Sequence, residues 1–260
     1  MAFDLYQIDA FTDRVFSGNP AAVCPLDTWL GEDVMQAIAA ENNLSETAFF
    51  VPRGDDFDLR WFTPTCEVDL CGHATLASAY LILSRLDPGR EKVTFHSRSG
   101  PLTVSREGDL LAMDFPAWER KAISPPEGLG AALGCKARAV YFGRDRHMAV
   151  FSSAADVRGL GPDMGALARV SPGRVIVTAA GDDCDFVSRF FAPGSGIDED
   201  PVTGSSHCLL VPYWADRLGK SDLHARQVSA RGGELYCRHR GERVVIAGRA
   251  ALYLAGRVRF

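Results

Sequence analysis

Short alternating or apolar runs, separated by Gly, Pro and Asp turns, dominate the first half of the chain. Such runs predict β-strands, because successive side chains of a strand face opposite sides of a sheet. Two helices are expected among them, at Asp33–Asn42 and Ala74–Leu83. The second is apolar on nearly every side, which predicts a helix that strands bury all round. The expected strands are Leu5–Phe11, Ala48–Val51, Asp58–Phe62, Lys92–Phe95, Leu102–Ser105 and Leu110–Phe115.

The second half of the chain follows the same plan. Residues 116–134 are expected to link the halves and to hold a short helix. A central helix is expected at Ser205–Leu218, where Pro212 predicts a kink because it has no backbone N–H. The strands expected around this helix are Ala137–Phe142, Met148–Phe151, Val175–Thr178, Phe186–Phe191, Gln227–Ser229, Glu234–Cys237 and Val244–Ala247.

Two stretches of the sequence resemble one another, residues 61–75 and residues 190–205. Each runs through an aromatic strand, a proline turn, an acidic stretch, a tight Gly or Pro turn and an apolar helix. We therefore expect two related domains, residues 1–116 and 117–260, with the C-terminal strand packed back on the first. Helices that begin near the seam between such halves would expose backbone N–H groups there. Because these groups bind anions, the repeat predicts a receptor for a small carboxylate.

Composition narrows the class of protein. With 47% hydrophobic and 23% charged residues, the chain is typical of soluble globular proteins. Its net charge of −5 argues against a nucleic-acid partner, which would require a basic patch. No apolar run reaches the roughly 18 residues of a membrane span, and the N-terminus does not resemble a signal peptide. Seven scattered cysteines do not form a disulfide framework, so we expect a cytoplasmic protein.

Motifs of cofactor enzymes are present only in part. The Gly128–Gly134 run follows a proline turn rather than a strand, which the dinucleotide-binding loop requires. Gly219-Lys220-Ser221 lacks the earlier glycine of a phosphate-binding loop. The potential zinc ligands also have unsuitable spacing; they are Cys66, Cys71, His73, His207 and Cys208. We therefore expect no metal and no organic cofactor.

Glu46 is a candidate for acid–base chemistry. It lies between the end of an expected helix and the apolar strand Ala48–Val51. Leu44 and Phe49 beside it would partly desolvate the carboxyl group, and desolvation favours the neutral form that an acid–base catalyst must be able to adopt. The competing interpretation is a solvated turn glutamate.

Residues at the two expected helix starts are candidates for binding an anion. Gly72 and His73 open the first helix, where free N–H groups and a missing side chain permit close approach of a ligand. Cys71 could be a reactive thiolate, stabilised by the same helix dipole. Asp200 precedes the second helix, where an acid is also favoured simply as a cap.

Six segments occur in a characteristic order along the chain: Phe11–Pro20, Asn43–Ala48, Phe62–Pro64, Gly72–Thr75, Asp114–Ala117 and Glu199–Ser205. Together they strongly resemble the PhzF-like family of phenazine-biosynthesis isomerases, and the resemblance spans nearly the whole chain. It implies the diaminopimelate-epimerase fold. This is an α/β (α+β) fold of two similar halves, each a strand barrel around a central helix, with the active site in the cleft between them.

The resemblance also implies roles for individual residues. Glu46 corresponds to the acid–base glutamate of the family, and His73 and Asp200 correspond to residues that assist it. The backbone at Gly72, Gly204 and Ser205 would hold the substrate carboxylate, close to Cys71. The chain departs from the phenazine enzyme at Ala74 and Val202, where that enzyme has proline and alanine. Its Cys71 matches a catalytic cysteine of diaminopimelate epimerases, but the second cysteine of that pair is missing.

We therefore expect a cofactor-independent isomerase of a small carboxylic acid that works by proton abstraction and return by Glu46. One alternative is an amino-acid racemase or epimerase that uses Cys71 as a base. Another is a non-catalytic protein that binds a small carboxylate on the same scaffold. The family resemblance implies a homodimer, and the expected binding partner is a small-molecule carboxylate substrate. Net charge and the lack of a long apolar run predict no nucleic-acid or membrane partner. The identity of the substrate is left open, because loops whose packing the sequence does not reveal would shape its site.

Overall fold

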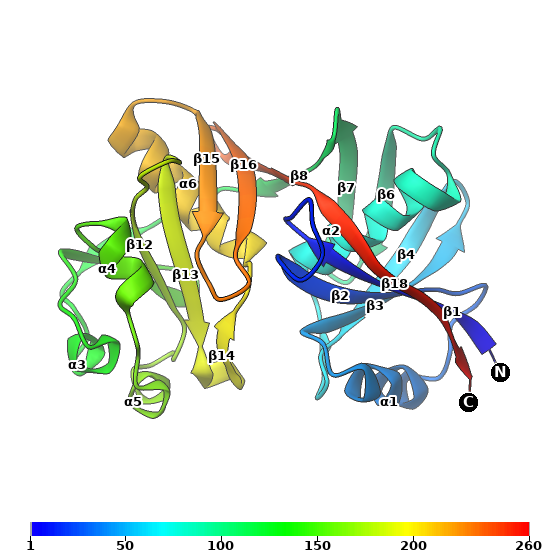
Figure 1. Cartoon of the computed structure of the whole chain (residues 1–260), viewed down its shortest axis with the longest axis horizontal. Helices are drawn as coiled ribbons and strands as arrows, with labels where there is room; N and C mark the ends of the chain where they lie inside the picture. Colours follow the sequence, from blue (N-terminus) through cyan, green and yellow to red (C-terminus); the bar gives the residue numbers. More distant parts are fainter. Residues whose placement is uncertain (1, 260) are drawn as a thin grey trace. The chain divides into compact units, whose positions relative to one another are not determined.

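Two compact units make up the part of the chain that the computed structural model describes, residues 2–259 (Figure 1). The first unit comprises residues 2–114 and 247–259, and the second comprises residues 115–246. The C-terminal segment belongs to the first unit because its strand pairs antiparallel with the first strand of the chain. Residue 116, the expected boundary, lies beside this division.

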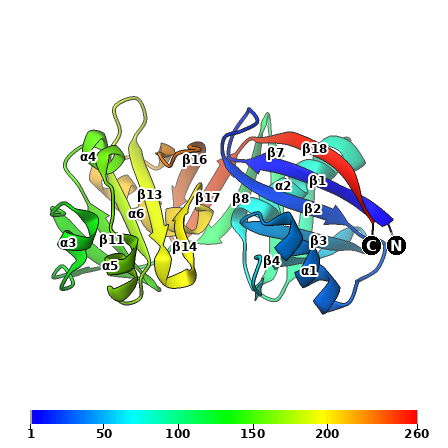
Figure 2. The same ribbon diagram turned by 60° about the horizontal axis from the view of Figure 1, so that its bottom comes forward.

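In the first unit, strands surround one helix, α2, while another, α1, lies outside them (Figures 1 and 2). The elements of this unit are β1 (Ala2–Ala10), β2 (Asn19–Pro25), α1 (Glu32–Asn42), β3 (Glu46–Arg53), β4 (Asp56–Phe62), β5 (Glu67–Val68), α2 (Gly72–Leu81), the π-helical turn η1 (Ile82–Leu86), β6 (Lys92–Ser97), β7 (Gly100–Glu107), β8 (Leu110–Pro116, at the boundary) and β18 (Ala250–Arg259). Nearly every residue of α2 is buried, as its all-round apolar sequence predicts.

The second unit is also built around one buried helix, α6. Its elements are β9 (Lys121–Ile123), α3 (Leu129–Leu133), β10 (Ala139–Gly143), β11 (Arg146–Val150), α4 (Ala154–Gly159), α5 (Met164–Arg169), β12 (Val175–Ala180), β13 (Phe186–Ala192), the 3₁₀ turn η2 (Pro193–Ser195), β14 (Ile197–Asp200), α6 (Gly204–Leu218), β15 (Asp222–Gln227), β16 (Gly233–Arg240) and β17 (Arg243–Gly248). The burial of both central helices confirms the expectation from the sequence.

The strands pair in the same sequence of orientations in both units. From β1 through β2, β3, β4 and β6 to β7, the pairings alternate antiparallel, parallel, antiparallel, parallel, antiparallel. From β10 through β11, β12, β13 and β15 to β16, the order is identical. The two halves therefore share one topology, which confirms the internal repeat that the sequence predicted.

A repeated hairpin shows the duplication at the level of side chains. In the first unit, Arg60 forms two hydrogen bonds with Glu67 and lies over the Phe62 ring. In the second unit, Arg189 forms two hydrogen bonds with Glu199 and lies over the ring of Phe191 in the same way. Such paired N–H···O bonds fix the geometry of a hairpin, and each of these hairpins precedes the central helix of its unit.

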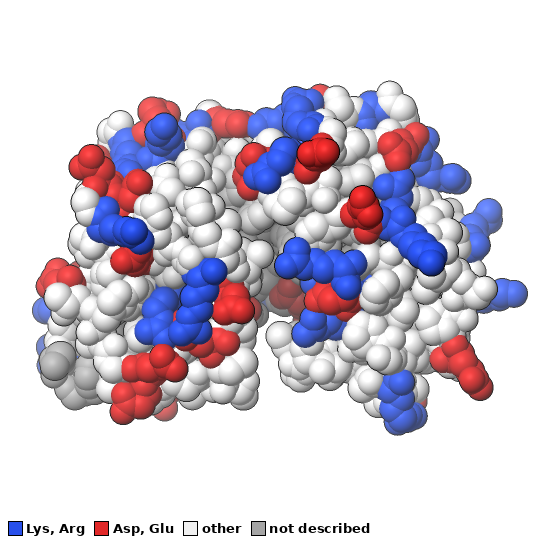
Figure 3. All heavy atoms as spheres, turned by 180° about the vertical axis from the view of Figure 1, so that it is seen from behind, with Lys and Arg blue, Asp and Glu red and all other residues white. Residues whose placement is uncertain are grey.

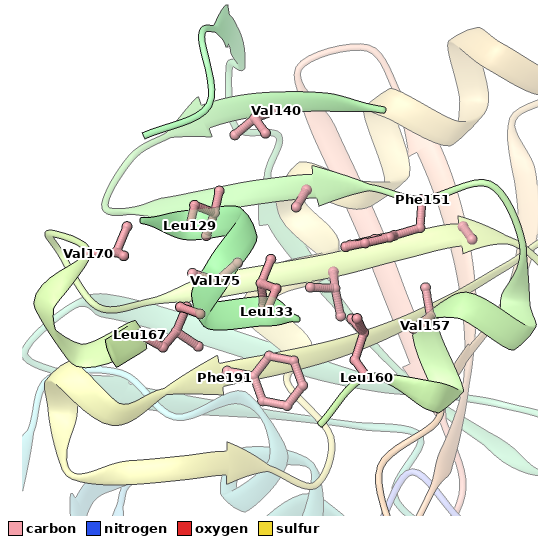
Figure 4. Packing of buried hydrophobic residues seen from close by; sticks show 14 of the residues in the cluster. Leu129, Leu133, Val140, Phe151, Val157, Leu160, Leu167, Val170, Val175 and Phe191 are labelled. Carbon is pink, nitrogen blue, oxygen red and sulfur yellow. The ribbon is translucent and has the colours of Figure 1, made fainter. Parts of the chain in front are cut away.

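Outer helices cover the face of each sheet that points away from its central helix. In the second unit, side chains of α3, α4 and α5 pack on strands β10 to β13, as Figure 4 shows for Leu129, Val157, Leu167 and Phe191. In the first unit, residues of α1 pack against Phe49 and Phe62 in an equivalent cluster. Each unit is thus layered as outer helix, sheet and central helix. Helices α4 and α5 are too short to give a sequence signal, so they were not predicted.

In the second unit, α6 and the strand that follows it differ in detail from the expectation. Pro212 lies within a continuous helix, and the backbone N–H of Trp118 donates to the Cys208 carbonyl at 2.9 Å. That carbonyl is the one that a proline four residues later leaves without its helical donor. The strand expected at residues 227–229 was placed too late in the chain, because β15 covers Asp222–Gln227. Its polar outward residues hid the buried alternation of Leu223, Ala225 and Gln227.

Charge is mixed on the face of the molecule seen in Figure 3, where Lys and Arg lie beside Asp and Glu. Nothing on this face resembles the continuous basic surface that a nucleic-acid partner requires. No helix within residues 2–259 is long and apolar enough to cross a membrane.

Candidate active site

Glu46 and His73 form a close pair in the first unit. Glu46 is the first residue of β3 and His73 the second residue of α2. The distance between Glu46 Oε2 and His73 Nε2 is 3.3 Å, and their side chains are 15% and 6% exposed. Glu46 is therefore partly desolvated, as the sequence predicted, and it is not the solvated turn residue of the competing interpretation.

A tight turn between β1 and β2 brings Asn19 next to His73. Gly18 has a φ of +68°, and a Cβ there would lie 2.2 Å from the carbonyl oxygen of Ala10, so only glycine fits this turn. The next residue, Asn19, is fully buried, and its Nδ2 lies 3.3 Å from His73 Nδ1. The loop from β1 to β2 therefore aims an amide at the imidazole ring.

The contact with the Asn19 amide favours one tautomer of His73. An amide nitrogen can only donate a hydrogen bond, so Nδ1 of the ring must accept it. Burial lowers the pKa of His73 to about 3, although the Pro20 carbonyl acts in the opposite direction, so the ring is neutral near pH 7. The single ring proton is then on Nε2, the nitrogen beside the Glu46 carboxyl group.

Cys71 completes the cluster from the other side of the ring. Its Sγ lies 3.5 Å from His73 Nδ1, and the thiol is buried. Ligand atoms of Glu46, Cys71 and His73 all lie within 4.8 Å of one another and are of types that zinc accepts. The thiol and the carboxyl group, however, approach different nitrogens of one imidazole. This arrangement suits proton transfer better than shared ligation of one ion.

The start of α2 is open to a ligand. Cys71 occupies the N-cap position, but its side chain does not cap the helix. A Cβ built on Gly72 would meet nothing within 4 Å, so the space beside this residue is empty of protein atoms. Backbone N–H groups of a helix start carry partial positive charge, which makes this space suitable for an anion.

A second cluster lies at the start of α6 in the second unit. The hydroxyl of Thr203 donates to Asp200 Oδ2 at 2.5 Å. The amide of Gln227, which is buried, accepts from the Thr203 N–H at 2.8 Å and donates to the carbonyl of Asp200 at 2.7 Å. These bonds fix the turn that delivers Gly204 and Ser205 to the first turn of the helix.

The chain is similar to known proteins over nearly its whole length. The profile of the phenazine biosynthesis-like protein family, PhzC-PhzF, matches residues 8–256. An uncharacterized isomerase of Pseudomonas aeruginosa is 53% identical over 98% of both chains. The crystal structure of a PhzF-family phenazine biosynthesis protein from Enterococcus faecalis has a TM-score of 0.97 at 47% identity and covers all of both chains. The chain belongs to the PhzF-like family.

The same fold also occurs in proteins outside that family. The structure of a hydroxyproline epimerase from Agrobacterium vitis has a TM-score of 0.64 at 10% identity, a likeness of fold alone. The PhzF-like chain thus has the diaminopimelate-epimerase fold that the sequence resemblance implied. Family membership, with relatives named as isomerases, places it among the isomerases.

Within each unit, the residues singled out in this PhzF-like sequence are brought together. Glu46, Cys71 and His73 form one cluster, with Gly72 at its edge. Asp200, Gly204 and Ser205 lie at one helix start. Cys66 is exposed and contacts Thr63, while Cys208 is buried within α6, so neither belongs to the cluster of the first unit.

Sequence reasoning missed three residues of these clusters. Asn19 was visible within the Phe11–Pro20 segment, but nothing in the sequence connected it with His73. Gln227 and Arg146 gave no signal, because each lies far along the chain from the helix start that it contacts. Contacts between such distant positions are created by folding alone.

Acid is expected to destabilise this PhzF-like protein. Burial lowers the pKa of His73 to about 3 and that of His207 to about 4, whereas in the unfolded chain both would bind protons near the ordinary value of about 6.5. The free energy of unfolding should therefore fall by up to about 1.4 kcal/mol per pH unit for each histidine as the pH drops from about 6.5 towards 4.

Urea unfolding at a series of pH values measures this loss. A His207→Leu variant should show a shallower dependence on pH even if it is less stable throughout, because one titrating group is gone. Equal unfolding free energies of the unchanged protein at neutral pH and at about pH 5 would contradict the prediction.

Proposed function

We propose that this PhzF-like chain is a cofactor-independent isomerase of a small, unsaturated or activated carboxylic acid. Glu46 removes a proton from an acidic carbon of the substrate and returns it to another carbon of the conjugated system. No proton is gained or lost overall, and one base performs both transfers. The observation that carries this proposal is the close pairing of Glu46 with a buried, neutral His73, whose Nε2 lies 3.3 Å from the carboxylate.

The pair suits a base that must take up a proton and release it again. A neutral imidazole beside the carboxylate places no full positive charge next to it. A fully charged imidazolium would hold the carboxylate in its ionised form, which would weaken it as a base. The low exposure of both side chains also keeps water from exchanging with the abstracted proton.

Other residues of the two clusters would bind the substrate. The backbone at Gly72 would hold its carboxylate, since the space beside this residue is open. We further propose that Asp200, Gly204 and Ser205 take part in substrate binding, as the family motif in this sequence implies. Donors at a helix start also stabilise the negative charge that develops after proton abstraction.

A thiol-based racemase or epimerase is the second candidate, because Cys71 Sγ contacts the imidazole of His73. An imidazole can activate a neighbouring thiol for proton transfer. Such mechanisms use two bases on opposite faces of the substrate carbon, however, and the helix start of the second unit carries Asp200 where a second thiol would be needed.

One experiment separates these functions. The protein is incubated in D₂O with small unsaturated carboxylic acids and with amino acids, and isomerised or deuterated products are followed by NMR. We expect isomerisation of an unsaturated acid, and we expect Cys71→Ser to retain substantial activity. A loss of about 10³-fold or more in this variant, together with inactivation by a thiol-alkylating reagent, would assign the chemistry to Cys71. Binding of an acid with no exchange or isomerisation would indicate a non-catalytic protein.

A further inference from the structure

Arg146 is the first residue of β11, and its side chain reaches the start of α6. The charge of this side chain is almost completely buried. The residue is 8% exposed, and its guanidinium lies between the rings of Trp118 and Phe190, at 5.1 Å and 4.8 Å from their centroids. Aromatic faces attract a cation and keep water from it. Burying the charge of an arginine in this way costs free energy, which indicates that this buried charge has a function.

The contacts of this guanidinium lead to the first turn of α6. Arg146 Nη1 donates to Ser205 Oγ at 3.2 Å and to Ser206 Oγ at 3.3 Å. A hydroxyl oxygen that accepts one hydrogen bond must direct its own proton elsewhere. Arg146 therefore turns the proton of Ser205, the more exposed of the two serines, away from the protein's own cation and makes this hydroxyl a donor to an incoming group.

The positive charge at this helix start is only partly neutralised. Arg146 Nε donates to Asp145 Oδ1 at 2.9 Å, while the other oxygen of this carboxylate pairs with Arg174. Burial acts to raise the pKa of Asp145, but the two arginines outweigh it and hold this pKa below its ordinary value. One carboxylate thus serves two guanidiniums. Within residues 2–259, Arg146 Nη2 makes no hydrogen bond.

We propose that Arg146 is a positioning and specificity-determining residue: it orients the Ser205 hydroxyl and supplies the charge by which the second unit selects a carboxylate over a neutral group. This inference rests on the proposed function, since it assumes a carboxylate ligand. The selectivity would then come from the side chain of Arg146 as well as from the backbone N–H groups at the start of α6. A buried guanidinium is worth more here than an exposed one, because its field is not screened by water.

The test compares crotonate, sorbate and benzoate with their neutral amides. Dissociation constants are measured by titration calorimetry for the unchanged protein, Arg146→Gln, Arg146→Lys and Arg144→Gln. Arg144 is the matched control, because it is exposed and lies over the same Trp118 ring without contacting either serine. Far-ultraviolet circular dichroism and thermal melts establish that each variant is folded.

We expect Arg146→Gln to weaken carboxylate binding by roughly 10- to 100-fold, the usual range for a lost charge-assisted hydrogen bond. Binding of the amides should be unaffected, and Arg144→Gln should behave like the unchanged protein. Arg146→Lys should lie between, since it keeps the charge but not the fork. If Arg146→Gln does not fold, weaker carboxylate binding by Arg146→Lys supports the proposal and unchanged carboxylate binding overturns it.

Two further outcomes keep this inference separate from the proposed function. If no carboxylate binds the unchanged protein, the proposed function fails and this inference fails with it. If carboxylates bind and Arg146→Gln binds them equally well, only the role of Arg146 is overturned. A double-mutant cycle with Ser205→Ala adds a test of positioning: the two losses should be less than additive, and full additivity would overturn the claim that Arg146 acts through Ser205.

Discussion

The Glu46→Gln variant is expected to lower turnover by roughly 10²–10⁴-fold, the usual contribution of a positioned acid–base group. Glutamine has the size of glutamate and keeps an amide oxygen beside His73 Nε2, so the fold of the cluster should be preserved. It has no basic oxygen that can take a proton from carbon. Substrate affinity should change little, because the groups proposed to hold the carboxylate are at the helix starts and not at Glu46.

Turnover is measured with the acid that the unchanged protein isomerises in D₂O, and affinity is measured separately by calorimetry. Glu46→Asp should also be severely impaired, because withdrawing the carboxylate by one methylene spoils its alignment with the substrate. Glu41→Gln is the control, since Glu41 is an exposed glutamate nearby on α1. Turnover of Glu46→Gln close to that of the unchanged protein would refute the mechanism.

The Phe191→Ala variant is expected to lose about 3–5 kcal/mol of stability, as is typical when a buried aromatic ring is removed. Phe191 lies on β13 and is fully buried against the outer helices (Figure 4). The guanidinium of Arg189 lies over its ring at 4.8 Å. Its removal leaves a cavity in this cluster and also loosens the hairpin that leads through β14 to Asp200.

Urea unfolding monitored by circular dichroism measures the loss. Phe191→Leu is the matched control and should cost less than about 1.5 kcal/mol, because it keeps much of the volume. Phe62→Ala provides a second comparison, since Phe62 occupies the equivalent position in the repeated hairpin of the first unit. A loss in Phe191→Ala no greater than that in Phe191→Leu would show that the cluster closes around the missing ring.

The central helices show which part of the fold is specified by the local sequence pattern. The apolar sequence of Ala74–Leu83 predicted a helix buried on all sides, and α2 is that helix. The outer helices α4 and α5 escaped prediction, because six residues are too few for a periodic pattern to stand out. The strand expected at residues 227–229 was placed too late, because β15 covers Asp222–Gln227 and ends on a residue that is polar yet buried. The amide of Gln227 bonds Thr203 and Asp200.

The sequence by itself determined the duplicated architecture and the family, because both depend on segments whose order and spacing are visible along the chain. It also identified Glu46, His73 and Asp200 as candidates, since each lies in such a segment. Only the tertiary structure decided that Asn19 contacts the His73 ring and that Arg146 reaches Ser205. Those partners are separated by 54 and 59 residues. Hydrogen bonds of this kind depend on the register of paired strands and the packing of a helix against them, which no local pattern of residue types encodes.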